Sequence, residues 1–448
     1  MIGIETVGNA TLIAHDQRPV LCTDPWIDGE PYFGSWGHRY AIPAEQLAHI
    51  KACEYVWFSH GHPDHLDAAS LPYFRTKRIL LPDHVGQRIK NELLASGFDV
   101  QVFETAKWYD LSEHVRVLCL TDYNQDAVLL VDVNGRLFLD LNDSTNRDWT
   151  GFIRKTASRY EKSFLLRLIN HGDADMMNFF DQEGRRVVPA RIKSVPLGAK
   201  VKAGLASTGA RFYVPFSTFH VYRRTDSVWA NDYVTMGPEE LVEGFEEGRD
   251  RLLPANLRYD CETDRHEQLD APVLPIVAQP PERFGDSWAD QLDAADVETA
   301  RRYFDGVESL RGHIDFIRLV VGGRETVISL ARRRFKTGIT FEAPRNSLMA
   351  SIQGEVFDDM LIGNFMKTTL HHMGSLYPHF APYVAKYADN GHAKTKSEVR
   401  RYLSAYRRRN PFAMMKHELE LRTTQRLRDF ILSNRTLTKA AYAVYRRF

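Results

Sequence analysis

The sequence predicts an α/β (α+β) fold, with an αββα sandwich over residues 1–270 and a mainly helical domain over residues 286–448. Three observations lead to this prediction. Short apolar runs separated by turns fill the first part of the chain, several of these runs end in clusters of His, Asp or Asn, and helical spacing becomes more frequent after residue 285. Alternation of apolar strands with helices is typical of layered folds that cover a sheet with helices.

The expected strands follow one another along the first half of the chain. IGIETVGNATLIAH and RPVLCTDPW predict an opening pair, and EYVWFSH, KRILLPDH and VRVLCLTD predict the next three. VGQRIKNELLASG predicts a helix between the last two of these. In DAVLLVDVNGRLFLDLND, Asn134-Gly135 lies between two apolar runs and suits a type I′ turn, which predicts a hairpin. SFLLRLINHGD and ARFYVPFSTFH predict two later strands, each followed by a polar loop.

A proline-rich stretch over residues 271–285, APVLPIVAQPPERFG, is expected to be a linker or a long surface crossing. After it, residues 287–321 and the stretch FDDMLIGNFMKTTLHHM have helical spacing, whereas RETVISLARRRFKTGITFEAPRNSLMASIQG favours strands and turns. Residues 394–448 are predicted to be helical and rich in arginine. Those arginines form either a solvated helix face or a contact for a partner or an anionic substrate.

Composition narrows the classes of function. The 58 Lys and Arg balance the 58 Asp and Glu, so net charge gives no argument for a nucleic-acid partner. No apolar run reaches the ~20 residues that a membrane span needs, and the N-terminus has no basic, apolar leader. The cysteines are far apart and mostly in apolar surroundings, which favours reduced core thiols and a cytoplasmic location. They are Cys22, Cys53, Cys119 and Cys261.

Residues 59–67 read Ser-His-Gly-His-Pro-Asp-His-Leu-Asp, directly after a predicted strand. Three histidines and an aspartate within six residues would crowd several polar groups into one loop with nothing to satisfy them. Imidazole and carboxylate are ligands that suit zinc, iron and manganese. The predicted metal ligands of this loop are therefore His60, His62, Asp64 and His65.

The His-x-His-x-Asp-His pattern resembles that of the metallo-β-lactamase fold family, over roughly residues 1–240. In that family the first two histidines bind one metal ion and the Asp-His pair binds a second. The resemblance therefore implies two divalent ions, the first bound by His60 and His62 and the second by Asp64 and His65.

Further aspartates fit this implied arrangement. In RLFLDLNDST, Asp143 takes the place of the aspartate that bridges the two ions, with Asp140 as the second choice. Asp24, in LCTDPW, matches the aspartate that supports the metal loop from behind, although a simple turn or helix-cap role explains it equally well. Asp64 and Asp143 are the candidate catalytic carboxylates.

Two positions depart from the family pattern. Where its third histidine normally ends a strand, VRVLCLTD places Asp122, and an added carboxylate shifts the expectation from zinc to iron. The alternative is a turn aspartate that caps the loop YNQD. Where the last histidine normally falls, YVPFSTFH has Ser217, so that His220 and His171, in LINHGDAD, are rival candidates.

A narrower resemblance begins at the hairpin. LNDSTN, FLLRLINHGDADMMNFF and ARFYVPFSTFHVYRRTDSVWANDY, in this order, are similar to the CMP-N-acetylneuraminate hydroxylase group. This implies an oxygen-using iron enzyme that acts on a nucleotide sugar or a related glycan precursor. That group also carries a Rieske iron–sulfur domain with two Cys-x-His pairs. Because Cys-x-His does not occur in this sequence, no Rieske cluster is expected, and a separate electron-transfer protein is the implied partner.

Three classes of function follow. The preferred one is an oxygenase in which two irons bind and split O₂. The alternative is a zinc hydrolase of a phosphoester, lactone or amide, in which the metal lowers the pKa of a water toward ~7. A scaffold with a decayed site is disfavoured by the intact HGHPDH cluster. Near the expected mouth, Tyr222, Arg223 and Arg224 are candidates for binding an anionic small molecule, with a surface salt-bridge patch as the alternative.

Overall fold

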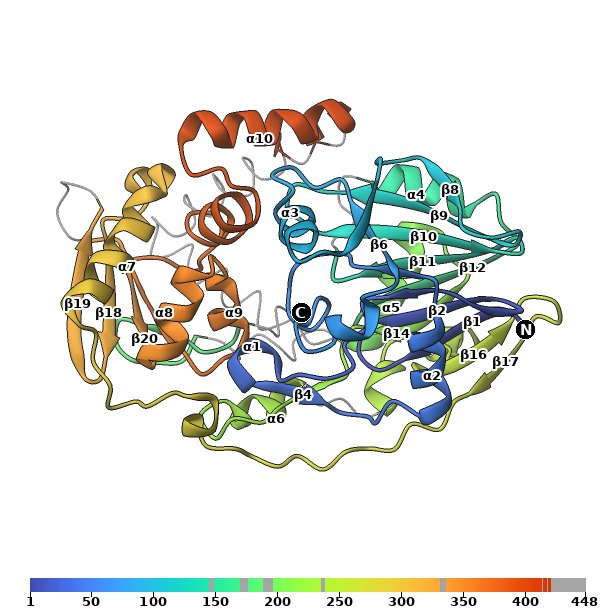
Figure 1. Cartoon of the computed structure of the whole chain (residues 1–448), viewed down its shortest axis with the longest axis horizontal. Helices are drawn as coiled ribbons and strands as arrows, with labels where there is room; N and C mark the ends of the chain where they lie inside the picture. The colour runs from blue at the N-terminus through green and yellow to red at the C-terminus, as the bar shows by residue number, and fades with distance from the viewer. Residues whose placement is uncertain are drawn as a thin grey trace.

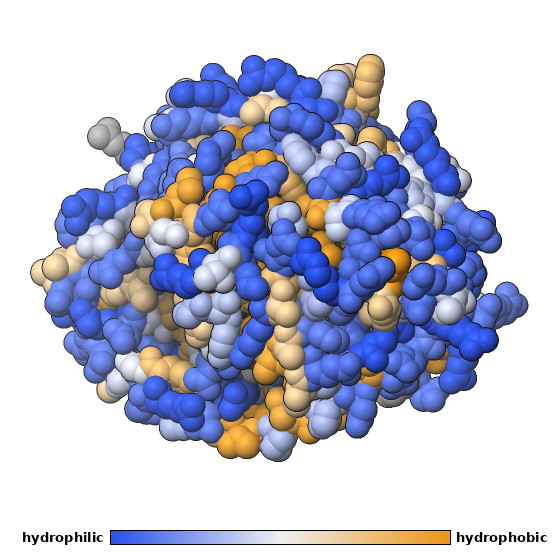
Figure 2. Space-filling view, turned by 45° about the vertical axis from the view of Figure 1, so that its right-hand side comes forward, coloured by the Kyte–Doolittle hydropathy of each residue, from blue (hydrophilic) through white to orange (hydrophobic). Residues whose placement is uncertain are grey.

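The computed structural model of the chain describes residues 1–144, 149–169, 176–187, 196–234, 238–330, 336–412, 414–416 and 418–419. His171 lies outside the described residues. Among the described residues, no helix combines the length and apolar character that crossing a bilayer requires. The face drawn in Figure 2 is mostly hydrophilic, with hydrophobic residues visible between the hydrophilic ones.

The first sheet contains eight strands from the beginning and middle of the chain. In sheet order they are β17 (Arg265–Gln268), β16 (Leu257–Asp260), β1 (Ile2–Val7), β2 (Thr11–Asp16), β3 (Arg18–Thr23), β5 (Tyr55–Trp57), β6 (Arg78–Pro82) and β7 (Asp99–Phe103). The strands from β3 to β7 are parallel, which requires crossover connections. Helices α2 (Ala44–Ala52) and α3 (Arg88–Ala95) lie in two of these connections.

The second sheet contains six strands. In sheet order they are β14 (Phe212–Phe216), β12 (Lys162–Leu168), β11 (Arg136–Asn142), β10 (Ala127–Val133), β9 (Val115–Thr121) and β8 (Trp108–Asp110). The predicted hairpin joins β10 to β11, and both Asn134 and Gly135 have the positive φ that a type I′ turn requires. Helices α4 (Thr150–Ala157) and α5 (Leu197–Thr208) precede β12 and β14.

The two sheets pack face to face, with helices on their outer faces (Figure 1). Leu12 and Leu21 of the first sheet share one buried cluster with Val117, Leu129 and Leu166 of the second. Helices α2 and α3 pack on the outside of the first sheet, and α4 and α5 pack on the outside of the second. Because both faces are covered, β10 is buried along its whole length. The predicted αββα sandwich is therefore confirmed.

The second part of the chain is built around a five-stranded sheet. Its order is β13 (Phe179–Asp181), β21 (Lys367–His371), β20 (Gly338–Glu342), β18 (Phe316–Val321) and β19 (Arg324–Ser329). Its longer helices are α7 (Ala294–Gly306), α8 (Arg345–Gln353), α9 (Phe357–Ile362), the π-helix η8 (Pro382–Asn390) and α10 (Lys396–Arg409). Helices hold more of the described residues than strands do here, but the sheet organises the core.

The helical interpretation of two segments is wrong. Residues 287–321 contain α7 but end in strand β18, where Ile317, Leu319 and Val321 alternate toward the core with a period of two. FDDMLIGNFMKTTLHHM contains α9 and then strand β21. The boundaries 1–270, 271–285 and 286–448 stay a prediction, and β13 shows that the earlier residues also contribute to the second part's sheet.

Residues 271–280 cross the surface as an extended segment (Figure 1), with Val273, Ile276 and Val277 exposed. Shorter elements complete the described part of the chain. They are α1 (Pro31–Gly34), β4 (Trp36–His38), η1 (Leu71–Phe74), β15 (His220–Tyr222), η3 (Val228–Ala230), α6 (Asn231–Val234), η4 (Pro238–Leu241), η5 (Glu246–Arg251), η6 (Pro281–Phe284) and η7 (Glu308–Gly312).

Helix α10 is not simply solvated along its basic face. Tyr402 and Tyr406 are buried, and both hydroxyls bind the side chain of Gln125 in the loop after β9. Arg409 donates to Asp83 and to the hydroxyl of Thr121. The helix is therefore docked on the sandwich through both tyrosines and one arginine.

Candidate metal centre

The histidine loop lies at the carboxyl end of the parallel strands of the first sheet. It follows β5, while Asp24 follows β3 and His84 follows β6. In the second sheet, Asp143 and Ser217 directly follow β11 and β14. In open α/β sheets the carboxyl ends of parallel strands are the usual place for ligand sites. One ligand atom from each of His60, His65 and Asp143 lies within 4.8 Å of the others.

Asp24 connects three segments of the site. Its carboxylate accepts hydrogen bonds from Ser59 N at 2.8 Å, Ser59 Oγ at 2.7 Å and Asn142 Nδ2 at 2.6 Å. Its Oδ2 also lies 3.1 Å from His65 Nδ1, and the residue is fully buried. Asp24 therefore contacts the histidine loop at Ser59 and His65 and connects this loop to Asn142 at the end of β11.

Four residues around the site have a strained backbone conformation. Asp24, Tyr32, Asn142 and Ser217 all have positive φ, between 41° and 56°, although none of them is glycine. Such conformations cost about 1–3 kcal/mol each and are typical of functional sites whose surroundings hold them in place. These four conformations therefore lower the stability of the fold, and the surrounding structure must hold them in place.

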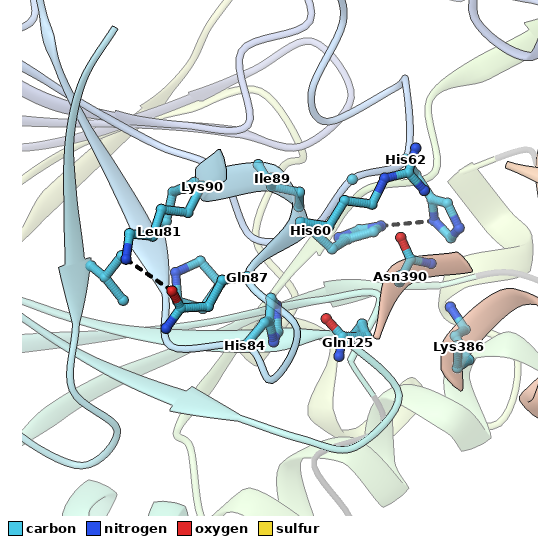
Figure 3. A pocket seen from close by; sticks show the side chains of 14 residues that line it. His60, His62, Leu81, His84, Gln87, Ile89, Lys90, Gln125, Lys386 and Asn390 are labelled. Carbon is cyan, nitrogen blue, oxygen red and sulfur yellow. Dashed lines mark hydrogen bonds between the residues drawn. The ribbon is translucent and has the colours of Figure 1, made fainter. Parts of the chain in front are cut away.

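His60 and His62 point ring nitrogens at each other (Figure 3). His60 Nε2 lies 2.8 Å from His62 Nδ1. The outward nitrogens are held separately, His60 Nδ1 at 2.9 Å from Ser59 Oγ and His62 Nε2 at 3.1 Å from Asp358 Oδ2. Burial, together with the charges of His65 and His62, holds the pKa of His60 well below its usual value. Two imidazole rings that converge in this way are suited to share one cation.

Asp64 and His65 form the second half of the loop. Tyr32 OH donates to Asp64 Oδ1 at 2.5 Å, and Asn9 Nδ2 donates to Asp64 Oδ2 at 2.9 Å. Burial opposes ionisation, but His65 and the tyrosine hold the pKa of Asp64 well below its usual value. His65 Nε2 lies 3.3 Å from Asp64 Oδ2 and 3.5 Å from Asp143 Oδ2. Although burial lowers the pKa of His65, the surrounding carboxylates raise it above normal.

His220 is buried on β15 with its ring stacked flat on Trp36, at 3.3 Å between centroids. Neither of its ring nitrogens has a hydrogen-bond partner among the described residues. Burial lowers its pKa to about 4, and the charges of Asp64 and Asp143 act on it in the opposite direction. Ser217 Oγ donates to Asp143 Oδ1 at 2.5 Å and so fixes that carboxylate.

Asp122 makes the contacts that the turn-capping alternative predicts, and its role as a metal ligand stays a prediction. Its Oδ1 accepts from the backbone N–H of Asn124 at 2.8 Å and of Asp126 at 3.3 Å, which is the turn-capping alternative. Asp126, which the sequence analysis missed, is the loop carboxylate whose charge interacts with His62, His65 and Asp143, and burial raises its pKa. Asp140 is buried on β11, where burial and the charge of Asp24 raise its pKa.

The substrate-binding assignment to Tyr222 and Arg224 needs correction. Both are fully buried. Arg224 donates to Asp286, to Asp226 and to the carbonyl of Phe33, so it holds the second part of the chain to the sandwich. Tyr222 donates to the carbonyl of Ile362 and accepts from Asn364. Arg223 is partly exposed, and its Nη1 lies 3.6 Å from Glu30 Oε1.

Residues from the second part of the chain reach the site. Asp358 and Asp359 of α9 group with His62, and Lys386 and Asn390 of η8 line a small pocket beside His60 and His62 (Figure 3). Sequence reasoning did not find them, because EVFDDM reads as an ordinary helix start. The only available signal was a pair of acids inside an otherwise apolar stretch.

The sequence has partial relatives among known proteins. No family model matches it. It is 26% identical over 136 residues to a cytidine monophosphate-N-acetylneuraminic acid hydroxylase of Asterias rubens, which covers 28% of this chain and 21% of that protein. It is 33% identical over 104 residues to a Mycobacterium tuberculosis protein described as a Rieske 2Fe-2S iron–sulfur protein, covering 23% and 20%. The matches thus span about a fifth of these relatives.

The chain also has weak likenesses to solved structures, one of which is described as a metallo-β-lactamase fold protein from Bacillus subtilis, with a TM-score of 0.33 at 10% identity, over 56% of this chain and 92% of that one. CmlA, a diiron β-hydroxylase from Streptomyces venezuelae, has a TM-score of 0.37 at 15% identity, over 60% of this chain and 54% of that one. Igni18, a metallo hydrolase from Ignicoccus hospitalis, has a TM-score of 0.37 at 12% identity, over 60% and 99%. The fold assignment itself rests on the sheet order and packing described above.

Proposed function

We propose that this chain is a dinuclear metalloenzyme, and that it is an iron-dependent hydroxylase of an anionic small molecule such as a nucleotide sugar. The observation that carries the proposal is His220, whose two buried ring nitrogens lack hydrogen-bond partners among the described residues, although the charges of Asp64 and Asp143 act on the ring. Burying polar groups without partners costs free energy, and a metal ion at this place would remove that cost.

The donor set fits two ions. His60 and His62 converge on one point, and His65 lies between two carboxylates. The proposed ligands are His60 and His62 for the first ion, Asp64, His65 and His220 for the second, and Asp143 between them. His171 stays the rival of His220. Asp122 stays the proposed further carboxylate of the first ion, and Asp126, whose charge interacts with His62, is proposed as its rival.

Iron is favoured over zinc because oxygen ligands are numerous around the histidines. When bound, two irons would supply the activation of O₂ that inserts an oxygen atom into a C–H bond, with electrons from a separate electron-transfer protein. The chain's own residues prepare the site. Tyr32 and Asn9 keep Asp64 ionised and fixed, Ser217 fixes Asp143, and Trp36 shields one face of the His220 ring from water.

The partial relatives support the hydroxylase, since several are named hydroxylases of cytidine monophosphate-N-acetylneuraminic acid. The alternative is a zinc-dependent hydrolase of a phosphoester, lactone or amide. The share of histidine in the ligand set favours this alternative, because four imidazoles suit zinc.

The test compares O₂ uptake with hydrolysis. Protein loaded with ferrous iron and supplied with NADPH and a ferredoxin–reductase pair is incubated with CMP-N-acetylneuraminate under isotopically labelled O₂. We expect O₂ uptake above that of the His62→Ala variant, and label in any product formed. Uptake equal to that of the variant, or zinc as the resident metal with hydrolysis of a phosphoester, lactone or amide, would overturn the hydroxylase.

A further inference from the structure

We propose that Asp358, in helix α9 of the second part of the chain, is a positioning residue for His62, so that the metal centre is completed from outside the sandwich. This inference rests on the proposed function. It assigns a role to a residue 296 positions away from the histidine in sequence.

The two ring nitrogens of His62 have different neighbours. Nδ1 faces His60 Nε2 at 2.8 Å, and Nε2 faces Asp358 Oδ2 at 3.1 Å. An ionised carboxylate only accepts hydrogen bonds, so the hydrogen between His62 and Asp358 belongs to Nε2. In the neutral ring, this leaves the lone pair on Nδ1, on the side where His60 lies. Asp358 therefore selects the tautomer that a metal ligand needs.

His60 has a matching arrangement on its own outer nitrogen. Its Nδ1 lies 2.9 Å from Ser59 Oγ, and that hydroxyl donates to Asp24 at 2.7 Å. Both histidines thus have the inner nitrogen directed to a shared point and the outer nitrogen fixed by a carboxylate, directly for His62 and through a hydroxyl for His60. Metal-ligating histidines almost always show this pattern, in which the outer N–H donates to a carboxylate, a carbonyl or water.

The surroundings of Asp358 favour a dedicated role over a general structural one. Its side chain is only 4% exposed, and a buried carboxylate is costly unless it is well paired. Among the described residues, the cationic or imidazole groups within ion-pair distance are His62 and Lys386, and Lys386 Nζ is 4.0 Å away, beyond hydrogen-bond distance. Its close partner is therefore the histidine, while Lys386 of η8 balances its charge from 4.0 Å away.

The test measures metal affinity rather than turnover. Cobalt(II) alone is titrated into metal-free protein with a competing chelator, and its visible absorption reports coordination. We expect Asp358→Ala to weaken one of two cobalt sites by about 10–100-fold and to leave the other within about twofold. Asp358→Asn keeps an acceptor oxygen without the charge, so its loss should be intermediate.

Asp389→Asn is the matched control. Asp389 is a buried carboxylate of the same part of the chain, but it accepts from Tyr303 OH at 2.7 Å rather than from a histidine. This variant should bind cobalt like the wild type. If Asp358→Ala does not fold, Asp358→Asn decides alone.

Unchanged cobalt affinity and absorption in a folded Asp358 variant would overturn the positioning role, as would equal weakening of both sites. In either case the proposed function would stand. Wild-type protein that binds no cobalt would instead overturn the proposed function itself, so the two failures are distinguishable.

Discussion

Removing the carboxylate of Asp24 should destabilise the fold as well as the metal centre. Three hydrogen bonds end on this buried carboxylate, two from Ser59 and one from Asn142. Hydrogen bonds to a charged group contribute about 1.5 kcal/mol each at the low end. We therefore expect Asp24→Ala to lower the free energy of unfolding by about 4 kcal/mol, which is a large fraction of the 5–15 kcal/mol typical of a domain.

The assay is urea denaturation followed by tryptophan fluorescence, since Trp26 and Trp57 are buried close to this residue in sequence and in the sheet. A chelator is present throughout, so that metal loss does not contribute. Asp24→Asn keeps one acceptor oxygen and should lose about half as much. A loss below about 1 kcal/mol for Asp24→Ala would refute the reasoning, because it would mean that the three bonds add nothing to stability.

Three further predictions follow from other contacts. Arg409→Gln should lower the free energy of unfolding by about 2 kcal/mol in urea melts, because the variant loses the hydrogen bonds to Asp83. The same change at the exposed Arg408 should alter the free energy of unfolding by less than about 0.5 kcal/mol. Equal effects of the two changes would show that α10 is not docked through Arg409. Burial raises the pKa of Glu5, but hydrogen bonds from His15, His49 and Arg258 hold it well below its ordinary 4.5. A depressed carboxyl pKa stabilises the fold above the unfolded value and loses that effect as pH falls, so stability should decline below about pH 4.5, and less steeply in Glu5→Gln; parallel pH profiles would contradict this. His220→Ala should keep its melting temperature in chelator but bind one metal fewer by elemental analysis, and two metals per chain would move the assignment to His171.

Local patterns explain why much of the sandwich could be predicted. The hairpin depends on two adjacent residues, Asn134 and Gly135, and the histidine loop depends on one short segment after a buried strand. Both are decided within a few residues, where turn chemistry and ligand spacing are specific. The apolar run at β18 was harder, because a short apolar run is compatible with a helix or a strand until its partners are known.

The parts of the site that sequence reasoning missed come from long-range packing. The contact between Asp358 and His62 joins residues that are far apart in the chain, and no local sequence pattern around either residue predicts this contact. Arg224 was predicted to bind an anion because the local sequence, YRRTDS, does not show that Asp286 and Asp226 already accept hydrogen bonds from its guanidinium group. Asp122 and Asp126 lie in one loop, and the sequence does not show that Asp122 caps the turn while the charge of Asp126 interacts with His62 and His65.

The most direct test of the central claim is the metal content of the protein purified without added metal, measured by elemental analysis beside His62→Ala and Asp64→Ala. Each variant removes one proposed ligand from a loop that contributes little to the hydrophobic core, so both should stay folded by circular dichroism. We expect two iron ions per wild-type chain and at least one fewer in each variant. Wild-type protein without bound metal, or variants that retain the full complement, would contradict it.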